Sequence, residues 1–558
     1  MPIDRAWNAY IFRDGKTLVS GSALLHDLAD RLSTFRPSAP ALIDLLLRAG
    51  ELECALRDVD SRDSSSIATI SDAIAASSIS DVALPSAELA ALARAIAVPV
   101  EMSLAPPEGF AYYALHPMDF ADLVRRVTAR TTNAAVIGIR SIGATLSAVV
   151  RAALRADGRH AERITVRPTG HPYDRRTHFS YEEKQWIVAM LARNADFYIV
   201  DEGPGMSGSS FLSVGDALVE AGVPRSQISF LGSRIPDPST LTAPNAAERW
   251  TTFSAHFTEP TRHLPARAAQ YVAGGIWRAT AFPCEADWPA SWRQMERLKF
   301  LSEDGSLLFR FEGFGRFGEA VHQRAVKIAD AGFGPMPLPP EEGFGVYPMI
   351  AGRSLTPARS TPQVLTRLAE YCAFRTQILP YGVSHTPELE TMLRFNTLEE
   401  FGTELPAVLS VLPIERPVIA DGRMLSYKWI STGTSILKID AVSHGDDHFF
   451  PGPTDIAWDL AGTIVEWNLT GESAAFFLDR YRQRSGDDPS GRLPLYLLAY
   501  SIFRTAYCKM AAVASNGTVE CDRFLRDLDR YRQRAAAQLA TVVGQRPAKS
   551  VGADTQAA

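Results

Sequence analysis

Short apolar runs alternate with amphipathic stretches in the middle of the chain, between residues 134 and 232. The pattern predicts strands at 134–139, 164–167, 197–200 and 223–232, and helices at 144–154 and 211–221. Strands that alternate with helices predict a parallel sheet covered on both faces, so this region is expected to be an α/β domain. Ligands of such sheets bind at the carboxyl ends of the strands, and candidate chemistry is expected there.

The pattern changes on either side of this segment. Residues 1–105 show two helical stretches, at 40–52 and 87–97, and carry no recognisable chemistry. From about residue 300 a strand at 306–312 precedes a helix at 319–331 and a long helix at 363–378. We therefore predict an N-terminal helical region over 1–105, the α/β domain over 106–240, a connecting region over 241–299, a second domain over 300–545 and a disordered tail over 546–558.

Two acids follow the strand at 197–200, and a loop of small residues then leads into the next helix. Backbone N–H groups at a helix N-terminus are unpaired and the helix dipole favours anions, so this loop suits a phosphate. The residues available to contact it are Gly203, Gly205, Ser207, Gly208, Ser209 and Ser210. The acids, Asp201 and Glu202, could accept hydrogen bonds from a sugar diol or hold magnesium.

Two further basic segments precede this acidic corner. The strand at 134–139 runs through a tight turn, Arg140 to Gly143, into a helix, which makes a second strand–turn–helix anion site. A polar loop at 168–178 follows the strand at 164–167, and its basic residues would suit a flap that closes over a polyphosphate. These basic residues are Arg167, His171, Arg175, Arg176 and His178. A solvated basic loop is the simpler alternative.

The order of strand, acid pair, small-residue loop and helix resembles the signature of the type I phosphoribosyltransferase fold. Ser207-Gly208-Ser209-Ser210 stands where that family has Thr-Gly-x-Thr, in a loop about one residue longer. The resemblance implies magnesium-dependent chemistry on a phosphorylated ribose, with Asp201 and Glu202 at the ribose hydroxyls. It implies a 5′-phosphate site at Gly205, Ser207, Gly208, Ser209 and Ser210, and a pyrophosphate site at Arg140, Ser141, Gly143, Arg167, Arg175 and Arg176.

The segment 417–467 of the second domain contains a regular series of acids. Asp421 follows Val418-Ile419-Ala420, a strand candidate at 427–430 comes next, and a strand at 435–440 ends in Asp440. An apolar helix carrying Asp455 and Asp459 then begins near residue 453. This order resembles aminoglycoside-phosphotransferase-type small-molecule kinases, whose domain is an α+β fold of two lobes. The resemblance implies Asp421 in the catalytic loop, Asp440 as metal ligand, and Arg310 in place of the lysine that holds ATP phosphates.

A second acidic motif, His444-Gly445-Asp446-Asp447-His448, offers an alternative. It matches the His-Gly-Asp catalytic motif of the same kinases, but it leaves no room for a metal-binding strand before Asp455. We therefore prefer the assignment to Asp421 and Asp440. Direct metal binding by this His/Asp cluster is the other alternative.

Composition excludes several classes. The net charge of -6 and the pI near 6.0 argue against a nucleic-acid-binding protein. The five cysteines are scattered and lack metal-binding spacing, which indicates reduced thiols and a cytoplasmic protein. The sequence contains no run of 18 apolar residues, so we expect no membrane span. The formal dinucleotide fingerprint at 313–318 lacks a later strand ending in an acid, which disfavours a dehydrogenase.

We predict a bifunctional enzyme that uses magnesium and ATP: phosphoribosyl transfer or cleavage in the first domain, and a kinase-like phosphotransferase in the second. The alternative is a nucleotide-sensing or scaffold protein with an inactive kinase-like domain. Arg310 and the replacement of His-Gly-Asp by Ala420-Asp421-Gly422 favour this alternative for the second domain. The acceptor, the relation between the two activities and the oligomeric state stay open.

Overall fold

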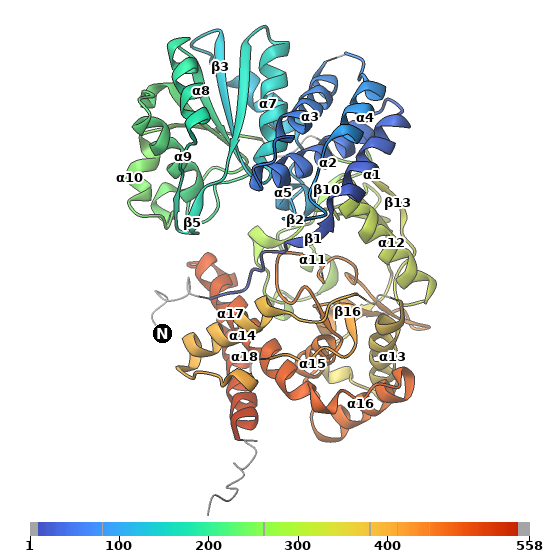
Figure 1. The fold of residues 1–558 in the computed structure, drawn as a ribbon. Coiled ribbons are helices and arrows are strands. Elements are labelled where there is room, and N and C mark those ends of the chain that lie inside the picture. Colours follow the sequence, from blue (N-terminus) through green and yellow to red (C-terminus); the bar gives the residue numbers. More distant parts are fainter. Residues whose placement is uncertain are drawn as a thin grey trace, which may run out of the picture.

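The computed structural model describes residues 9–80, 82–259, 263–378, 381–409, 411–445 and 447–544. Figure 1 shows a front domain, coloured blue to green, stacked on a rear domain, coloured yellow to red. Asp446 and the tail predicted at 546–558 lie outside the described residues. No helix in the described ranges is long and apolar enough to cross a bilayer.

The N-terminal region is a helical layer packed against the front domain. Its elements are β1 (Thr17–Ser20), α1 (Gly21–Ser33), α2 (Ala39–Asp58), α3 (Ser64–Ile79), α4 (Ser86–Ala95) and β2 (Glu101–Leu104), with β1 antiparallel to β2. Apolar side chains of α2, among them Leu46 and Leu56, are buried. α2 and α3 pack against α7 (Gly143–Ala156), so this layer covers one side of the sheet described next.

The predicted parallel sheet is confirmed. Its strands are β3 (Asn133–Ile139), β4 (His160–Val166), β7 (Asp196–Val200), β8 (Ile228–Gly232) and β9 (Ser254–Phe257), in the order β4-β3-β7-β8-β9. The helices α6 (Met118–Arg126), α7, α8 (Tyr181–Ala192), α9 (Ser209–Glu220) and α10 (Ala246–Thr251) surround it. All its pairings are parallel, so the carboxyl ends of β3, β4 and β7 share one edge. β9 falls within the predicted connecting region.

Two details of the front domain differ from the predicted pattern. The strand predicted from residue 223 begins only at Ile228, because Pro224 starts a 3-10 turn, η2 (Arg225–Gln227). The loop predicted at 168–178 contains a hairpin of β5 (Thr169–His171) and β6 (Asp174–Arg176). In Figure 1 this hairpin lies at the end of the parallel sheet that faces the rear domain.

The rear domain begins with a small antiparallel sheet. Its strands are β10 (Gln270–Tyr271), β11 (Lys299–Leu301), β12 (Leu307–Phe311), β13 (Leu338–Glu341) and β14 (Phe344–Pro348), in the order β10-β11-β12-β14-β13. α12 (Arg316–Asp330) connects β12 to β13. Phe309 and Phe311 belong to the same buried apolar cluster as Phe110 and Leu115 of the front domain. The small lobe is thus joined to the front domain by a shared core.

The larger lobe is mainly helical. Its elements are β15 (Arg353–Ser354), α13 (Pro362–Ile378), α14 (Pro387–Phe401), β16 (Pro417–Ile419), β17 (Trp429–Ser431), β18 (Ile436–Lys438), β19 (Pro453–Asp455), α15 (Ala457–Glu466), α16 (Gly471–Ser485), α17 (Leu493–Ala514) and α18 (Val519–Gly544). Trp429, Trp458 and Trp467 are fully buried in its core. The helix predicted to open at Pro453 begins instead at Ala457, since Pro453–Asp455 pairs with β16 and the Asp455 carboxylate accepts a hydrogen bond from the Ala457 N–H.

Short elements complete the chain: α5 (Glu108–Ala111), α11 (Arg278–Ala281), and the 3-10 turns η3 (Pro238–Thr240), η4 (Glu285–Asp287), η5 (Arg293–Met295), η6 (Pro357–Arg359), η7 (Ala407–Leu409), η8 (Ser426–Lys428) and η9 (Pro489–Gly491). The first described residues cross from the front domain onto the larger lobe. There Phe12 forms a β-bridge with Phe449, and the Arg13 N–H donates to the His448 carbonyl at 2.8 Å.

Candidate functional site

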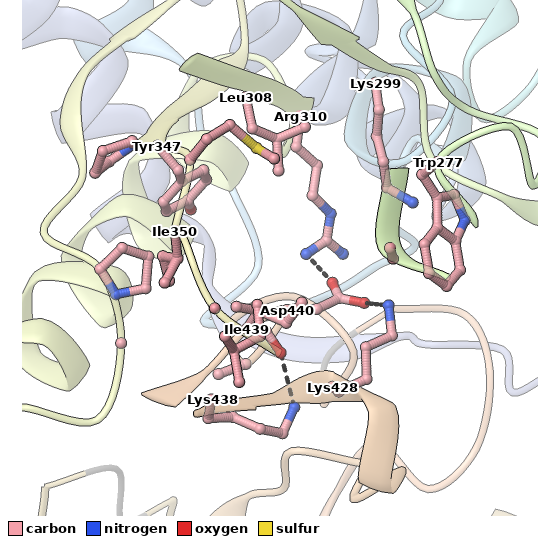
Figure 2. Close-up of a pocket in the computed structure, with 18 of the residues that line it drawn as sticks. Trp277, Lys299, Leu308, Arg310, Tyr347, Ile350, Lys428, Lys438, Ile439 and Asp440 are labelled. Atoms are coloured by element: carbon pink, nitrogen blue, oxygen red, sulfur yellow. Dashed lines mark hydrogen bonds and ion pairs between the residues drawn. The ribbon is translucent and has the colours of Figure 1, made fainter. Parts of the chain in front are cut away.

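A cavity of about 240 Å³ lies between the small sheet and the larger lobe of the rear domain. Much of its wall is apolar or aromatic. The residues are Leu308 on β12, Ile328 on α12, Tyr347 on β14, Ile350 in the segment that connects the lobes, and Ile439 after β18. Figure 2 shows Leu308, Tyr347, Ile350 and Ile439 around the cavity, with the charged groups of Arg310, Lys428 and Asp440 close together. The cavity therefore offers an apolar slot for a flat group and a polar end for charges.

The polar end is organised around Asp440, which follows β18. Arg310 of β12 and Lys428 reach its carboxylate from opposite sides (Figure 2), with 2.5 Å between Lys428 Nζ and Asp440 Oδ2. His444 Nε2 lies 3.1 Å from Asp440 Oδ1. Burial alone would raise the pKa of Asp440, but Arg310, Lys428 and His444 outweigh it and hold the pKa well below its usual range. Asp440 is therefore charged at neutral pH.

Arg310 and Asp440, selected from the sequence as nucleotide and metal residues, are thus brought into direct contact. Asp440 lies outside any group of three potential metal ligands, since the described residues contain none. Magnesium, however, keeps waters and substrate phosphates as ligands and needs only one or two protein carboxylates. Asp440, charged and at the polar end of the cavity, is one such carboxylate.

Asp421 has a different environment. Its side chain is fully buried, and it lines neither this cavity nor the smaller one beside it. The Tyr371 hydroxyl donates to Asp421 Oδ2 at 2.5 Å, and Lys438 Nζ lies 3.3 Å from Oδ1. Because Lys438 does line the cavity, Asp421 touches the site through this lysine.

The two helix acids hold the loop that carries Asp421. Asp459 accepts hydrogen bonds from the backbone N–H groups of Asp421 at 2.7 Å and Gly422 at 2.9 Å. Asp455 accepts from Glu415 and Arg416 N–H groups and pairs with Arg492. Both acids are fully buried and take part in building the site without facing the cavity.

The His444–His448 motif lies next to Asp440, inside the charged end. His444 Nδ1 is 3.3 Å from Asp447 Oδ2, and His448 Nε2 is 2.7 Å from the Tyr113 hydroxyl of the front domain. Burial lowers the pKa of both histidines, that of His448 to about 4, so His448 is neutral at pH 7. Asp446 lies outside the described residues, and the described part of the motif forms no metal-binding group.

The front domain places its acid pair at the shared strand edge. Asp201 and Glu202 follow β7, and the backbone of Gly109 on α5 approaches so closely that an added Cβ would lie 2.9 Å from the Glu202 carboxylate. Burial raises the pKa of Asp201 to about 7, and the neighbouring Glu202 adds to the rise. Burial also raises the pKa of Glu202.

The predicted phosphate loop lies beneath the β5–β6 hairpin. The hydroxyls of Ser207 and Ser209 donate to the Pro172 carbonyl at the hairpin tip, at 3.0 and 2.7 Å. Ser209 and Ser210 begin α9, Gly208 precedes it with a φ of +67°, and the Cβ position of Gly205 faces open space. The hairpin thus already covers this loop, and Arg175 and Arg176 lie on it.

The predicted pyrophosphate arginines reach the same edge but face an internal partner. Arg140 Nε is 2.9 Å from Asp58 Oδ1 at the end of α2, and Arg167 makes two contacts with the same carboxylate. Ser141 precedes α7, and Gly143 at its start packs against Val200, where an added Cβ would lie 2.9 Å from the carbonyl oxygen. Asp58 therefore occupies the arginines that an anion would need.

Sequence reasoning missed several residues of the rear site. They are Trp277, Lys299, Arg423, Lys428 and Lys438, which line one or both cavities. Trp277 and Lys299 lay in a segment read as a connection. Lys428 directly precedes β17, Lys438 ends β18, and Asp440 follows two residues later. Two lysines this close to the predicted metal ligand were the sequence signal that could have identified them as site residues.

The rear domain thus has a small five-stranded lobe, a helical lobe and a charged cleft between them, the arrangement expected of a kinase-like protein. No family model and no curated protein matches the chain. Solved structures that are similar include a choline/ethanolamine kinase family protein from Mesorhizobium loti, at 19% identity and TM-score 0.32, covering 44% of this chain and 89% of that one.

Two further similar structures are a choline kinase and a spectinomycin phosphotransferase. Choline kinase from Streptococcus pneumoniae is 13% identical, with a TM-score of 0.31, covering 43% of this chain and 89% of that one. Spectinomycin phosphotransferase, solved with ADP and spectinomycin, is 14% identical, with a TM-score of 0.31, covering 48% and 92%. None of these structures supports a phosphoribosyltransferase-like domain.

Proposed function

We propose that the rear domain is a phosphotransferase that moves the terminal phosphoryl group of ATP to a hydroxyl of a small molecule. The observation that carries this proposal is the cavity between the lobes, which is apolar along its walls and ends in cations grouped around the charged Asp440. An apolar slot suits a nucleobase, and fixed cations suit the charge of a transferring phosphoryl group.

Each residue then has a defined part in the transfer. The bond between the γ-phosphorus and its bridging oxygen breaks, the acceptor oxygen bonds to phosphorus, and the hydroxyl proton passes to an oxygen of the transferred phosphoryl group. Arg310 and Lys428 would neutralise the phosphates, and Asp440 would hold magnesium, which supplies further charge neutralisation. We assign Asp421 the role of an orienting residue, since it contacts Lys438 and fixes the loop that leads to Arg423.

Calorimetric titration of ATP with magnesium tests the rear site. Wild type is expected to bind, and Arg310→Met is expected to lose affinity about tenfold or more, because a cation that faces phosphate is removed from a buried site. Arg359→Met, which removes an exposed arginine of η6, is the control and should bind as wild type does. Absence of ATP binding to wild type would refute the proposal and favour the scaffold alternative.

For the front domain we propose a second function, binding and transfer of a phosphorylated ribose such as phosphoribosyl pyrophosphate, with magnesium. Four features on one strand edge favour it: the acid pair after β7, the serine-rich turn at α9, the hairpin over that turn, and two arginines at the ends of β3 and β4. The acids fit a sugar diol or magnesium, and the turn fits a phosphate.

The same titration with phosphoribosyl pyrophosphate and magnesium tests the front site. Binding to wild type that disappears in Asp201→Asn/Glu202→Gln is the expected result. If the double variant still binds phosphoribosyl pyrophosphate, Asp201 and Glu202 are not part of its binding site. Neither heat nor thermal stabilisation in wild type would contradict the phosphoribosyl proposal as a whole.

A further inference from the structure

A second cavity of about 60 Å³ continues the charged end of the cleft toward the front domain. The two cavities share Arg310, Lys428 and Asp440 in their walls. The second one, which we call the chamber, is closed on its far side by Tyr112 and Tyr113, which come from the front domain. The chamber is therefore built by both domains, beyond the place where nucleotide phosphates would lie.

The described residues of the chamber wall carry a surplus of positive charge. Five cations, Arg297, Lys299, Arg310, Arg423 and Lys428, face three carboxylates, Glu296, Asp440 and Asp447. A fourth carboxylate, Glu312, lies behind the wall and pairs with Arg297 at 3.8 Å and Arg310 at 3.6 Å, which still leaves one positive charge. An anion is the ligand that such a wall favours.

Most of these charges already have partners. Lys299 Nζ lies 2.6 Å from Glu296, while Arg310 and Lys428 contact Asp440. Arg297 donates to the Ser443 carbonyl at 3.1 Å. The Arg423 guanidinium makes no hydrogen bond and no ion pair within 4 Å with any residue in the described ranges, and it lines the chamber among Tyr427 and Tyr507. Burial alone would lower its pKa, but Tyr507 and the nearby carboxylates of Asp447 and Asp440 outweigh burial and raise it. Arg423 is thus a charged group beside these acids, and its guanidinium is available to a ligand.

We propose that the chamber binds the phosphoryl acceptor and that this acceptor is an anion, a hydroxyl compound bearing a phosphate or a carboxylate, held by Arg423. This inference rests on the proposed phosphotransferase function and adds the substrate class. The acceptor hydroxyl would lie toward Asp440, where the phosphates arrive. The tyrosine and tryptophan rings around Arg423 supply the flat walls that suit a sugar or an aromatic ring.

The position of α5 indicates where such a compound could originate. A Cβ added at Gly109 on this helix would lie 2.9 Å from the Glu202 carboxylate of the front site. Tyr113, two residues after the helix ends at Ala111, lines the chamber, and its hydroxyl lies 2.7 Å from His448 Nε2. The two candidate sites are therefore close to each other along this segment of the chain. A phosphorylated ribose compound, the class proposed for the front site, is an anionic polyol and satisfies the chemistry of the chamber. A glycosyl-transfer reaction on such a compound would supply the acceptor.

Titration of ribose 5-phosphate into protein saturated with a non-hydrolysable ATP analogue tests the chamber. Ribose is the comparison without charge, and inorganic phosphate is the comparison without a sugar. Ribose 5-phosphate is expected to bind at two sites in wild type. Arg423→Gln should weaken one of them about tenfold or more, with Arg423→Lys in between, because a charge contact in a partly buried site is lost. Asp201→Asn/Glu202→Gln should remove the other site, and Arg359→Gln should change neither.

The outcomes separate the inference from the function beneath it. If ATP binds wild type but Arg423→Gln takes up ribose 5-phosphate as wild type does, the chamber assignment is wrong and the phosphotransferase proposal stands. Equal binding of ribose and ribose 5-phosphate at the Arg423-dependent site would overturn the anionic class. If ATP does not bind, the proposed function itself fails. Thermal melting of Arg423→Gln and Arg423→Lys shows whether each variant is folded, and a folded Lys variant keeps the test decisive.

Discussion

Asp201 and Asp440 are the same chemical group in similar places, Asp201 directly after β7 and Asp440 two residues after β18, yet their electrostatics are opposite. In the front domain, burial and the neighbouring Glu202 raise the pKa of Asp201 to about 7. Asp440 in the rear domain is also buried, but three basic side chains hold its pKa well below the usual range. The difference lies entirely in which neighbours the fold supplies.

The comparison shows what each site lacks. In the front site Asp58 pairs with Arg140 and Arg167. Arg167 and Arg234 lower the pKa values of Asp201 and Glu202 less than burial raises them, so the acid pair is suited to a metal ion. In the rear site the cations outnumber the acids, so the site is suited to anions. A magnesium complex of a phosphorylated compound would match both, with the metal facing the front acids and the phosphates facing the rear cations.

The largest expected effect comes from removing the charge of Asp440. Asp440→Asn leaves Arg310 and Lys428 buried without their counter-charge, which should lower the free energy of unfolding by about 3 kcal/mol. Urea unfolding at pH 7 measures this change, with the exposed acid in Glu303→Gln as the control. A loss no larger than that of the control would mean that the cations do not depend on Asp440.

A smaller, pH-dependent effect is expected at Asp201. The folded protein holds this proton up to about pH 7, whereas an unfolded aspartate releases it near pH 4, so the stability from this group falls as pH rises between these values. Asp201→Asn should therefore gain stability relative to wild type across this window, to about 2 kcal/mol at pH 8. Asp440 works in the opposite sense, since its stabilising effect is lost only as pH falls below about 4.

Thermal unfolding of wild type and Asp201→Asn from pH 4 to pH 8 measures the difference. A stability difference that stays constant with pH would show that Asp201 titrates normally. Ligand binding offers a second measurement: a protonated Asp201 cannot accept both diol hydrogen bonds or hold magnesium, so wild-type affinity for phosphoribosyl pyrophosphate should increase as pH rises through about 7.

The smallest expected effect is a gain of function in the front site. Asp58→Asn removes the negative charge that pairs with Arg140 and Arg167. An incoming pyrophosphate then no longer competes with the Asp58 carboxylate for these arginines, so the affinity for phosphoribosyl pyrophosphate should increase about threefold. Calorimetry with phosphoribosyl pyrophosphate measures this gain. Weaker binding in the variant would instead assign Asp58 the task of positioning the two arginines for the ligand.

The sequence indicated those parts of the sites that follow directly from a strand and its next turn. Asp201 and Glu202 were predicted at a strand end because an apolar run stops there, and the parallel sheet follows from the alternation of strands and helices. Arg310 and Asp440 were selected by their order along the chain, and the fold brings them into contact. Their chemical roles stay predictions.

What the sequence did not indicate depends on contacts between distant segments. Asp58 lies outside the helix predicted at 40–52, in a region predicted to carry no chemistry, and it meets Arg140 only because α2 extends to Asp58 and packs on α7. Tyr113 reaches His448 across 335 positions of the chain. β9 and β10 are too short to be distinguished from the irregular region around them. No periodicity within one segment reports such pairings.

The N-terminal segment has a consequence for how the molecule is made. Arg13 donates from its side chain to the Asp447 carbonyl, a contact between residues 434 positions apart. During synthesis this stretch leaves the ribosome long before its partner exists, so the front domain can assemble first while these few residues wait. Their docking closes a loop that spans most of the chain and is therefore expected to be a late event. A stretch that is made before the front domain is in this sense among the last to find its place.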